Sequence, residues 1–361
     1  MRPLFIIFLF LALGTSQSFS KDSGKFEIVA EFDRAPGNIT VTPDGRIVMS
    51  LHQFYKPEYS VVEVLPDHSL VPFPNAELNR RDSDQKLRLD SVLGIKADLA
   101  GTVWMLDNGL RSGTTPKLVA WNTRDDKLAR VIYLPESVVP ANAFVNDLVV
   151  DKLHKRIYIT DPAGGSNAAL IVVNLETGSA QRILEGDLSV VPEKLDLRVN
   201  KRPLRVKDSK GKIVHPKIGV NPIAMDFNNQ WVYFGSMHGT KLYRIHTKYL
   251  ANPSLPKGSL RGKVERYSTK PLSDGITMDK SGRIWMGELA ENAIGIVTPK
   301  KTYKRITQSP KLSWVDSLAI NPDGSVLAVA NQLHLSAPLN AGKQMSKPPY
   351  YLVRINPGAT L

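Results

Sequence analysis

A hairpin pattern recurs six times along the chain, and no other feature restricts the fold as strongly. The clearest copy spans residues 273–286, where a polar start, an apolar strand, a turn with Gly282 and a second apolar strand follow one another. The copies begin at Gly37, Leu93, Asn146, Asn221, Asp274 and Asp316, so the steps between them are 56, 53, 75, 53 and 42 residues. Self-similar units of this length are typical of propeller blades.

A third strand with alternating hydrophobicity follows each hairpin, and a fourth follows five of them. The sixth copy has no fourth strand after its third, at residues 351–355, whereas residues 25–32 form a strand without a place in any copy. Pairing the two would remove an open edge. We therefore predict an all-β fold, a six-bladed β-propeller of four-stranded blades closed by an N-terminal strand.

The N-terminal residues have the pattern of an export signal. Arg2 precedes an apolar run over residues 4–13, and Ser18 and Ser20 supply small residues before Lys21. This run is too short to span a membrane, and no later run reaches about 18 apolar residues. We expect a cleaved signal peptide at residues 1–20, one propeller domain at residues 21–361, no transmembrane segment, and a secreted or periplasmic protein.

The chain is basic, with 47 Lys and Arg against 34 Asp and Glu, and it contains no Cys. The absence of Cys excludes disulfides and thiolate metal sites. No nucleic-acid-binding motif accompanies the charge, so we do not expect a nucleic-acid partner. The densest basic cluster, residues 201–217, is interpreted as a solvated loop insertion. We expect this insertion and the loop at residues 332–349 to shape the mouth of a binding site.

Polar side chains gather at the first two positions of the repeats. Equivalent positions of a propeller meet around the central channel, whereas the third position of every copy is apolar and belongs to the core. The polar residues are Asn38, Asn146, Asp147, Asn221, Asp274 and Asp316. We predict that Asn38, Asn146, Asp147 and Asn221 bind a small-molecule ligand. The alternative is that these side chains cap strands and turns.

The same positions suggest a cation and a reaction. Oxygen donors without His or Cys suit a calcium-like divalent cation, with Asn221 and Asp274 as ligands. If Asp274 holds a metal, Asp316 is free to act as a general base, and the two are candidate catalytic residues for ester or lactone hydrolysis. No Gly-rich phosphate loop is present, and we expect no organic cofactor.

The tryptophans near the inner strands have a simpler interpretation. We assign Trp104, Trp231, Trp285 and Trp314 to packing between blades rather than to a platform that stacks on a ligand. The seven histidines show no metal-binding spacing. The sequence does not indicate an oligomeric state.

Several separate motifs resemble the Yellow and major royal jelly protein family. They are VWMLDNG at 103–109, NDLVVD at 146–151, WVDSL at 314–318 and NQLH at 331–334. This resemblance covers essentially the whole chain after the signal. It implies a secreted six-bladed propeller that binds small amines or other ligands.

A more distant resemblance is to gluconolactonase and senescence-marker propellers, which hold a divalent cation on the channel axis. It implies metal ligation by Asn221 and Asp274 and substrate contact by Asn146. The metal-binding Glu of that group is replaced here by Gly37 and Asn38, which should weaken a cation. Ligand binding is therefore the preferred interpretation, and a calcium-dependent lactonase or esterase-like hydrolase is the alternative.

Overall fold

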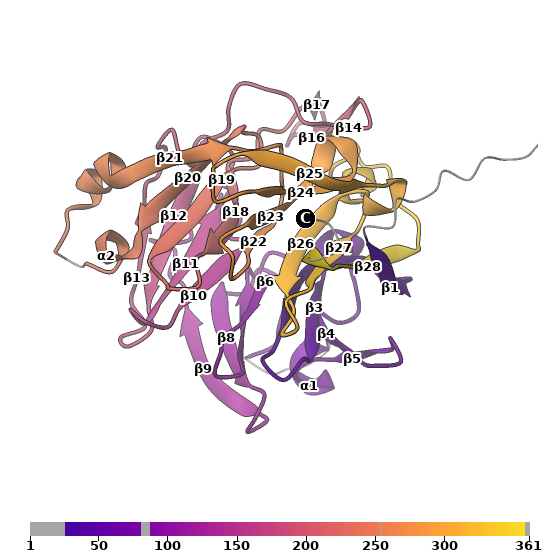
Figure 1. The fold of residues 1–361 in the computed structure, drawn as a ribbon, viewed down its shortest axis with the longest axis horizontal. Coiled ribbons are helices and arrows are strands. Elements are labelled where there is room, and N and C mark those ends of the chain that lie inside the picture. Colours follow the sequence, from indigo (N-terminus) through magenta and orange to yellow (C-terminus); the bar gives the residue numbers. More distant parts are fainter. Residues whose placement is uncertain (1–25, 81–86, 253, 358–361) are drawn as a thin grey trace, which may run out of the picture.

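Six four-stranded antiparallel sheets surround a central channel (Figure 1). The computed structural model describes residues 26–80, 87–252 and 254–357. The inner strands contact one another in the closed order β2, β6, β10, β18, β22, β26 and back to β2. The all-β prediction of a six-bladed propeller with four-stranded blades is confirmed.

Each of the first five blades is built from four consecutive strands, numbered from the channel outward. The first two are β2 (Pro36–Val41), β3 (Ile47–Leu51), β4 (Val61–Val64) and β5 (Leu70–Pro72), then β6 (Val92–Ala97), β7 (Thr102–Asp107), β8 (Lys117–Asn122) and β9 (Lys127–Tyr133). The third is β10 (Leu148–Asp151), β11 (Arg156–Asp161), β12 (Ala169–Asn174) and β13 (Ala180–Ile183). The fourth and fifth are β18 (Val220–Met225), β19 (Trp231–Ser236), β20 (Lys241–His246) and β21 (Val264–Thr269), then β22 (Ile276–Met278), β23 (Ile284–Glu288), β24 (Ala293–Val297) and β25 (Tyr303–Gln308).

The sixth blade joins the two ends of the described chain. It consists of β26 (Val315–Ile320), β27 (Val326–Ala330), β28 (Tyr350–Ile355) and the N-terminal strand β1 (Glu27–Phe32), which lies beside β28 (Figure 1). The register pairs Glu27 with Arg354 and Phe32 with Tyr350. The predicted closure by an N-terminal strand is therefore observed.

The inner hairpins of the second and fifth blades share one side-chain arrangement at their turns. Asp98 accepts two backbone N–H groups of its turn, and its second carboxylate oxygen accepts Trp104 Nε1–H at 3.2 Å. Asp279 does the same in the fifth blade, accepting Trp285 Nε1–H at 2.8 Å. The turn places Gly101 at φ 84°, a conformation that glycine adopts without steric cost. Each buried indole N–H is thus satisfied, which agrees with the packing role predicted for Trp104 and Trp285.

The hydrophobic core is divided among the gaps between blades. Leu106 and Ile159, from neighbouring blades, belong to one buried cluster, and Tyr158 and Phe234 belong to the next. Two four-residue helices, α1 (Ala76–Asn79) and α2 (Thr247–Leu250), lie outside the sheets. In the part of the chain that the structure describes, no helix has the length and hydrophobicity to cross a membrane. The predicted signal peptide lies outside the described residues.

The basic insertion is partly structured and packs against the propeller beside the second long loop. It forms two small hairpins, β14 (Arg198–Val199) with β15 (Arg202–Pro203), and β16 (Val206–Lys207) with β17 (Ile213–Val214). Leu197, Val199 and Leu204 are buried in one cluster with Trp314 and Leu339, which lie near β26 and in the second long loop. The interpretation as a solvated loop is therefore wrong for the apolar side of the insertion, because these side chains bury themselves against the propeller. Its basic residues remain mostly exposed.

Candidate functional site

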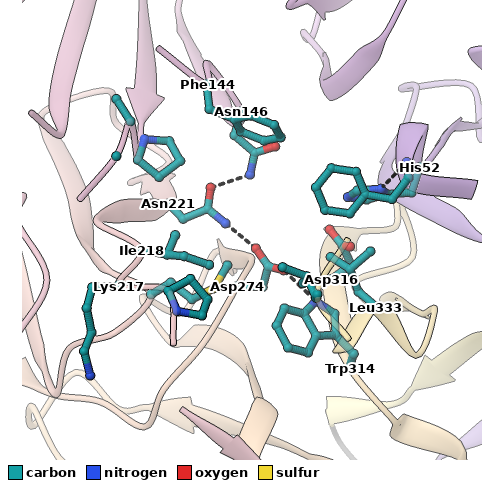
Figure 2. Close-up of a pocket in the computed structure, with 17 residues that line it drawn as sticks. His52, Phe144, Asn146, Lys217, Ile218, Asn221, Asp274, Trp314, Asp316 and Leu333 are labelled. Carbon is teal, nitrogen blue, oxygen red and sulfur yellow. Dashed lines mark hydrogen bonds between the residues drawn. The ribbon is translucent and has the colours of Figure 1, made fainter. Parts of the chain in front are cut away.

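A cavity of about 290 Å³ lies at the channel mouth (Figure 2). All inner strands run in the same direction, so their first residues meet at one end of the channel. Asn146, Asn221, Asp274 and Asp316 line this cavity, and they come from the third, fourth, fifth and sixth blades. Four of the six predicted site residues are therefore brought together.

Three of these residues form a hydrogen-bonded row across adjacent blades (Figure 2). Asn146 Nδ2 donates to Asn221 Oδ1, and Asn221 Nδ2 donates to Asp274 Oδ1. The other oxygen of Asp274 accepts Trp314 Nε1–H at 2.7 Å. The carboxylate of Asp274 is thus held by two donors from two different elements, which fixes its orientation.

Asp316 is not hydrogen-bonded to this row, and its carboxylate has a different partner. Its Oδ2 accepts Asn331 Nδ2–H at 2.5 Å, and the same amide donates to the backbone oxygen of Pro36 at 2.8 Å. Tyr55 Oη donates to the backbone oxygen of Asn331 at 2.7 Å. Asn331 therefore ties Asp316 to the start of the first blade.

A close backbone approach brings Asp316 beside Asp274. Gly275 follows Asp274, and a Cβ atom at Gly275 would lie 2.3 Å from the backbone oxygen of Asp316. Gly94 has the same relation to the backbone oxygen of Asn146, also at 2.3 Å. Glycine at the second position of these two copies therefore lets neighbouring inner strands approach each other closely at the end of the channel where the site residues lie.

Burial and repulsion from neighbouring carboxylates raise the pKa of both carboxyl groups of the cavity. Burial raises the pKa of Asp274 well above its usual range, as does the charge of Asp147, while the bond from Trp314 opposes the shift. Burial also raises the pKa of Asp316, followed by repulsion from Asp274, and the bond from Asn331 opposes it. A positive charge placed in the cavity would stabilise the ionised form of both groups.

The walls of the cavity are largely apolar. Phe54, Phe144, Ile218, Met237, Leu333 and Leu339 contribute to them. His52 belongs to the same lining, and burial lowers its pKa to about 3, so it is neutral at pH 7. Lys217 lies at the rim with its side chain directed away, where Nζ pairs with Asp196 (Figure 2).

A buried ion pair supports the Phe144 wall. Asp161 Oδ1 accepts the backbone N–H groups of Phe144 at 2.8 Å and Ala163 at 3.0 Å. Its other oxygen pairs with Arg182 Nη1 at 2.5 Å. Because both Phe144 and Ala163 line the cavity, this ion pair positions two segments of the lining.

Asn38 and Asp147 do not line this cavity. Asn38 Nδ2 donates to Asp147 Oδ1 at 2.7 Å, so the two predicted ligand-binding residues bind each other. Burial raises the pKa of Asp147 to about 7, while the charge of Lys96 and the bond from Asn38 oppose the shift. Lys96 lines a separate cavity, which does not include Asp274 or Asp316.

The donor set fits a divalent cation only in part. Asn146, Asn221 and Asp274 offer oxygen atoms, but their row is already joined by its own hydrogen bonds. Among residues 26–80, 87–252 and 254–357, no three His, Asp or Glu side chains form a group that could hold a metal. The six to eight oxygen ligands of calcium would therefore have to include water or ligand atoms.

Two residues of the site were not predicted from the sequence. Trp314 was assigned to packing, but it lines the cavity and donates to Asp274, so that assignment is incomplete. Trp314 has φ 60°, which is unusual for a large aromatic residue, and such backbone strain is found at functional sites. Asn331 directly follows β27, the second strand of its blade, and so lies away from the first positions of the repeats. A repeat alignment shows neither feature.

Fold and site together define a six-bladed β-propeller with an acidic, apolar-walled cavity on its axis. The family model of the major royal jelly proteins matches residues 90–346. The chain therefore belongs to the major royal jelly protein family, as the resemblance in its motifs implied.

An individual relative agrees with this assignment. Major royal jelly protein 1 of Apis mellifera is 20% identical over 250 residues, an alignment that covers 65% of this chain and 54% of that protein. The chain thus aligns with about half the length of this relative.

Solved structures confirm the fold. A gluconolactonase from Xanthomonas campestris superposes with a TM-score of 0.57 at 10% identity, covering 93% of this chain and 91% of its own. A luciferin-regenerating enzyme superposes with a TM-score of 0.57 at 11% identity, covering 92% and 94%. At these identities the likeness concerns the fold, and the predicted relation to gluconolactonase propellers is confirmed at that level.

Proposed function

We propose that this protein binds a small organic ligand, specifically an aromatic amine, in the channel-mouth cavity. One observation carries the proposal: two buried carboxyl groups, Asp274 and Asp316, lie in an apolar-walled cavity, and neither forms an ion pair with a described residue. An ammonium group supplies the missing positive charge. The ring of the ligand would then pack against Phe144 and the other apolar walls, which lose water on binding.

The size of the cavity agrees with such a ligand. About 290 Å³ lies at the lower end of the range for small-molecule sites. The two amides, Asn146 and Asn221, add polar groups that can orient a hydroxyl or a second nitrogen of the ligand. The family resemblance, which implies binding of small amines, supports the same class of ligand.

Calorimetry with three probes of one shape tests the proposal. The probes are 2-phenylethylamine, the uncharged 2-phenylethanol and the anionic 3-phenylpropionate, each titrated with and without a chelator. We expect saturable binding of the amine alone, and Asp274→Asn should weaken it about tenfold or more, as expected for losing a charged hydrogen bond. Asp125→Asn, an exposed residue in the second blade, is the matched control. Equal binding of amine and alcohol would contradict the proposal.

A lactone or ester hydrolase is the second candidate. The meeting of Asn146, Asn221 and Asp274 in one cavity favours it, because these residues match the substrate and metal ligands that the gluconolactonase resemblance implies. A cation would have to replace the hydrogen bonds that now join them. In this case a calcium-like cation binds Asn221 and Asp274, and Asp316 acts as the base. A lactone panel assayed with calcium and with chelator tests it: turnover that needs the cation and is lost in Asp316→Asn supports hydrolysis, and no turnover excludes it for that panel.

We also propose that the protein is exported after removal of residues 1–20. The apolar run and the small residues before Lys21 support this step. N-terminal sequencing of protein from the extracytoplasmic fraction should begin at Lys21. A chain that retains Met1 and stays in the cytoplasm would contradict it.

A further inference from the structure

The two long loops meet at a second cavity, outside the channel. This cavity has a volume of about 230 Å³, and Arg202, Leu204, Arg205, His334, Asn340 and Met345 contribute to its lining. The basic insertion provides one side and the loop after β27 provides the other. None of these residues belongs to the cavity at the channel mouth.

Backbone hydrogen bonds hold the two sides together. Arg205 N donates to Leu339 O at 3.0 Å, and Ala341 N donates to Arg205 O at 2.7 Å. The side chain of Arg205 also donates from Nη2 to Asn340 Oδ1 at 3.1 Å. The position of Arg205 is therefore fixed by its hydrogen bonds to the second long loop.

The cavity carries positive charge without a counter-charge. No Asp or Glu contributes to its lining. Within the described residues, neither Arg202 nor Arg205 forms an ion pair with a carboxylate, whereas Arg182 and Arg354 each do. A guanidinium group offers several N–H donors in a plane, an arrangement that matches the oxygens of phosphate, sulfate or carboxylate.

A buried histidine completes the lining. His334 is 7% exposed, and its Nδ1 atom is buried without a hydrogen-bond partner. Its ring is stacked on Trp314 with centroids 6.0 Å apart and planes at 15°. Burial lowers the pKa of His334 to about 4, with the charge of Arg202 acting in the same direction, so the ring is neutral at pH 7. Nδ1 is buried away from the cavity, so the other ring nitrogen, Nε2, for which no hydrogen-bond partner is found among the described residues, is the one left for a ligand.

We propose that this second cavity binds the oxyanion group of a small molecule, a phosphate or sulfate ester, between Arg202, Arg205 and His334. The two guanidinium groups provide charged hydrogen bonds to the oxyanion, and Nε2 of the neutral His334 ring provides a further one. A cavity of about 230 Å³ exceeds one tetrahedral ion, so it also holds part of the attached molecule. Leu204 and Met345 supply apolar surface of the lining for that part.

Titration of the intact protein with inorganic phosphate and with inorganic sulfate tests the site. Chloride at equal ionic strength is the reference, because general screening affects all salts alike. Binding is followed through the side-chain NMR signals of His334 and through thermal stability, which rises when a ligand binds only the folded state. We expect saturable binding of one or both oxyanions with a Kd of about 1 mM or tighter.

Three variants locate the site. Arg202→Gln and Arg205→Gln should each weaken binding about tenfold, whereas Lys212→Gln, an exposed basic residue of the same insertion, should change it by less than about twofold. Both arginines are exposed, but only the Arg205 side chain donates to Asn340 in the second long loop, so the Arg202 variant remains informative if Arg205→Gln fails to fold. An effect of Lys212→Gln equal to that of Arg202→Gln would overturn the proposal, as would His334 signals that move no further with phosphate or sulfate than with chloride. This test does not depend on the proposed function: oxyanion binding is expected whether or not the channel-mouth cavity binds an amine, because the two cavities share no lining residue.

Discussion

The amide of Asn221 donates a hydrogen bond to the carboxylate of Asp274, although 53 residues separate them in the sequence. They begin corresponding strands of adjacent blades, so the symmetry of the fold places one directly beside the other. Asp274 receives its second bond from Trp314, which precedes the next inner strand. Three successive blades therefore fix one carboxyl group in the cavity.

The indole of Trp314 should control the ionisation of Asp274. Trp314→Phe removes the N–H donor that stabilises the carboxylate and keeps an aromatic ring in place. The pKa of Asp274 should then rise further, so the pH at which 2-phenylethylamine binding becomes half-maximal should also rise. Affinity at pH 7 should fall about tenfold, as expected for one charged hydrogen bond.

Calorimetry over a range of pH checks this prediction. Trp285→Phe is the control, because Trp285 donates to Asp279 in the fifth-blade turn. An unchanged pH profile in Trp314→Phe would mean that the indole has no part in binding.

A side chain at Gly275 should disturb the site through the backbone. In Gly275→Ala, the new Cβ would lie 2.3 Å from the backbone oxygen of Asp316, so the two inner strands must separate. We expect a loss of about 1–3 kcal/mol in the free energy of unfolding, together with weaker amine binding. Gly258→Ala, where no atom lies within 4 Å of the new Cβ, should change neither quantity. Denaturant titration and calorimetry on both variants make the comparison.

The ion pair behind Phe144 should be important for stability. Arg182→Met leaves the buried carboxylate of Asp161 without its partner, which should cost about 3–5 kcal/mol in the free energy of unfolding. Lys127→Gln breaks an exposed pair with Asp125 and should cost less than about 1 kcal/mol. Similar unfolding midpoints for the two variants would show that burial of the Arg182 pair does not matter.

Asp147 should make stability dependent on pH. Burial raises its pKa in the folded state to about 7, above the usual value of 3.8. Between these values the folded state holds a proton that the unfolded state has released, so the contribution of Asp147 to stability falls as pH rises from about 4 to about 7. Above pH 7 the carboxylate is ionised in both states, and its unfavourable contribution stays constant.

Replacing this carboxyl group tests that account. Asp147→Asn should stabilise the protein at pH 8 by about 2–4 kcal/mol, and it should reduce the fall in stability between pH 4 and pH 7. Glu136→Gln, at an exposed position, is the control. Denaturant titrations with chelator present give both values, and a parallel pH profile in Asp147→Asn and the unaltered protein would contradict the shift.

Much of the fold could be predicted because its determinants are local and repeated. Turns such as that at Gly101, followed by alternating strands, occur in every blade in a similar form. The unpaired segment before residue 33 and the missing outer strand of the sixth blade could also be matched by counting strands. The same alignment placed Asn146, Asn221, Asp274 and Asp316 around the cavity.

The remaining features depend on side-chain orientations and long-range contacts that the repeated sequence pattern does not encode. Asn38 and Asp147 occupy the right columns, but they turn toward each other and not into the cavity. Trp314 reaches Asp274 because its backbone adopts a left-handed conformation. The folding of the basic insertion follows from Leu197 and Leu204, whose contacts with the propeller are distant in sequence. Such long-range contacts are not visible in composition or charge.

A structure of the protein soaked with 2-phenylethylamine tests the central claim most directly. The account predicts ligand density in the channel-mouth cavity, with the ammonium nitrogen within about 3 Å of a carboxylate oxygen of Asp274 or Asp316. The ring should contact Phe144 or the other apolar walls. An empty cavity at saturating ligand, or an amine bound elsewhere, would contradict it.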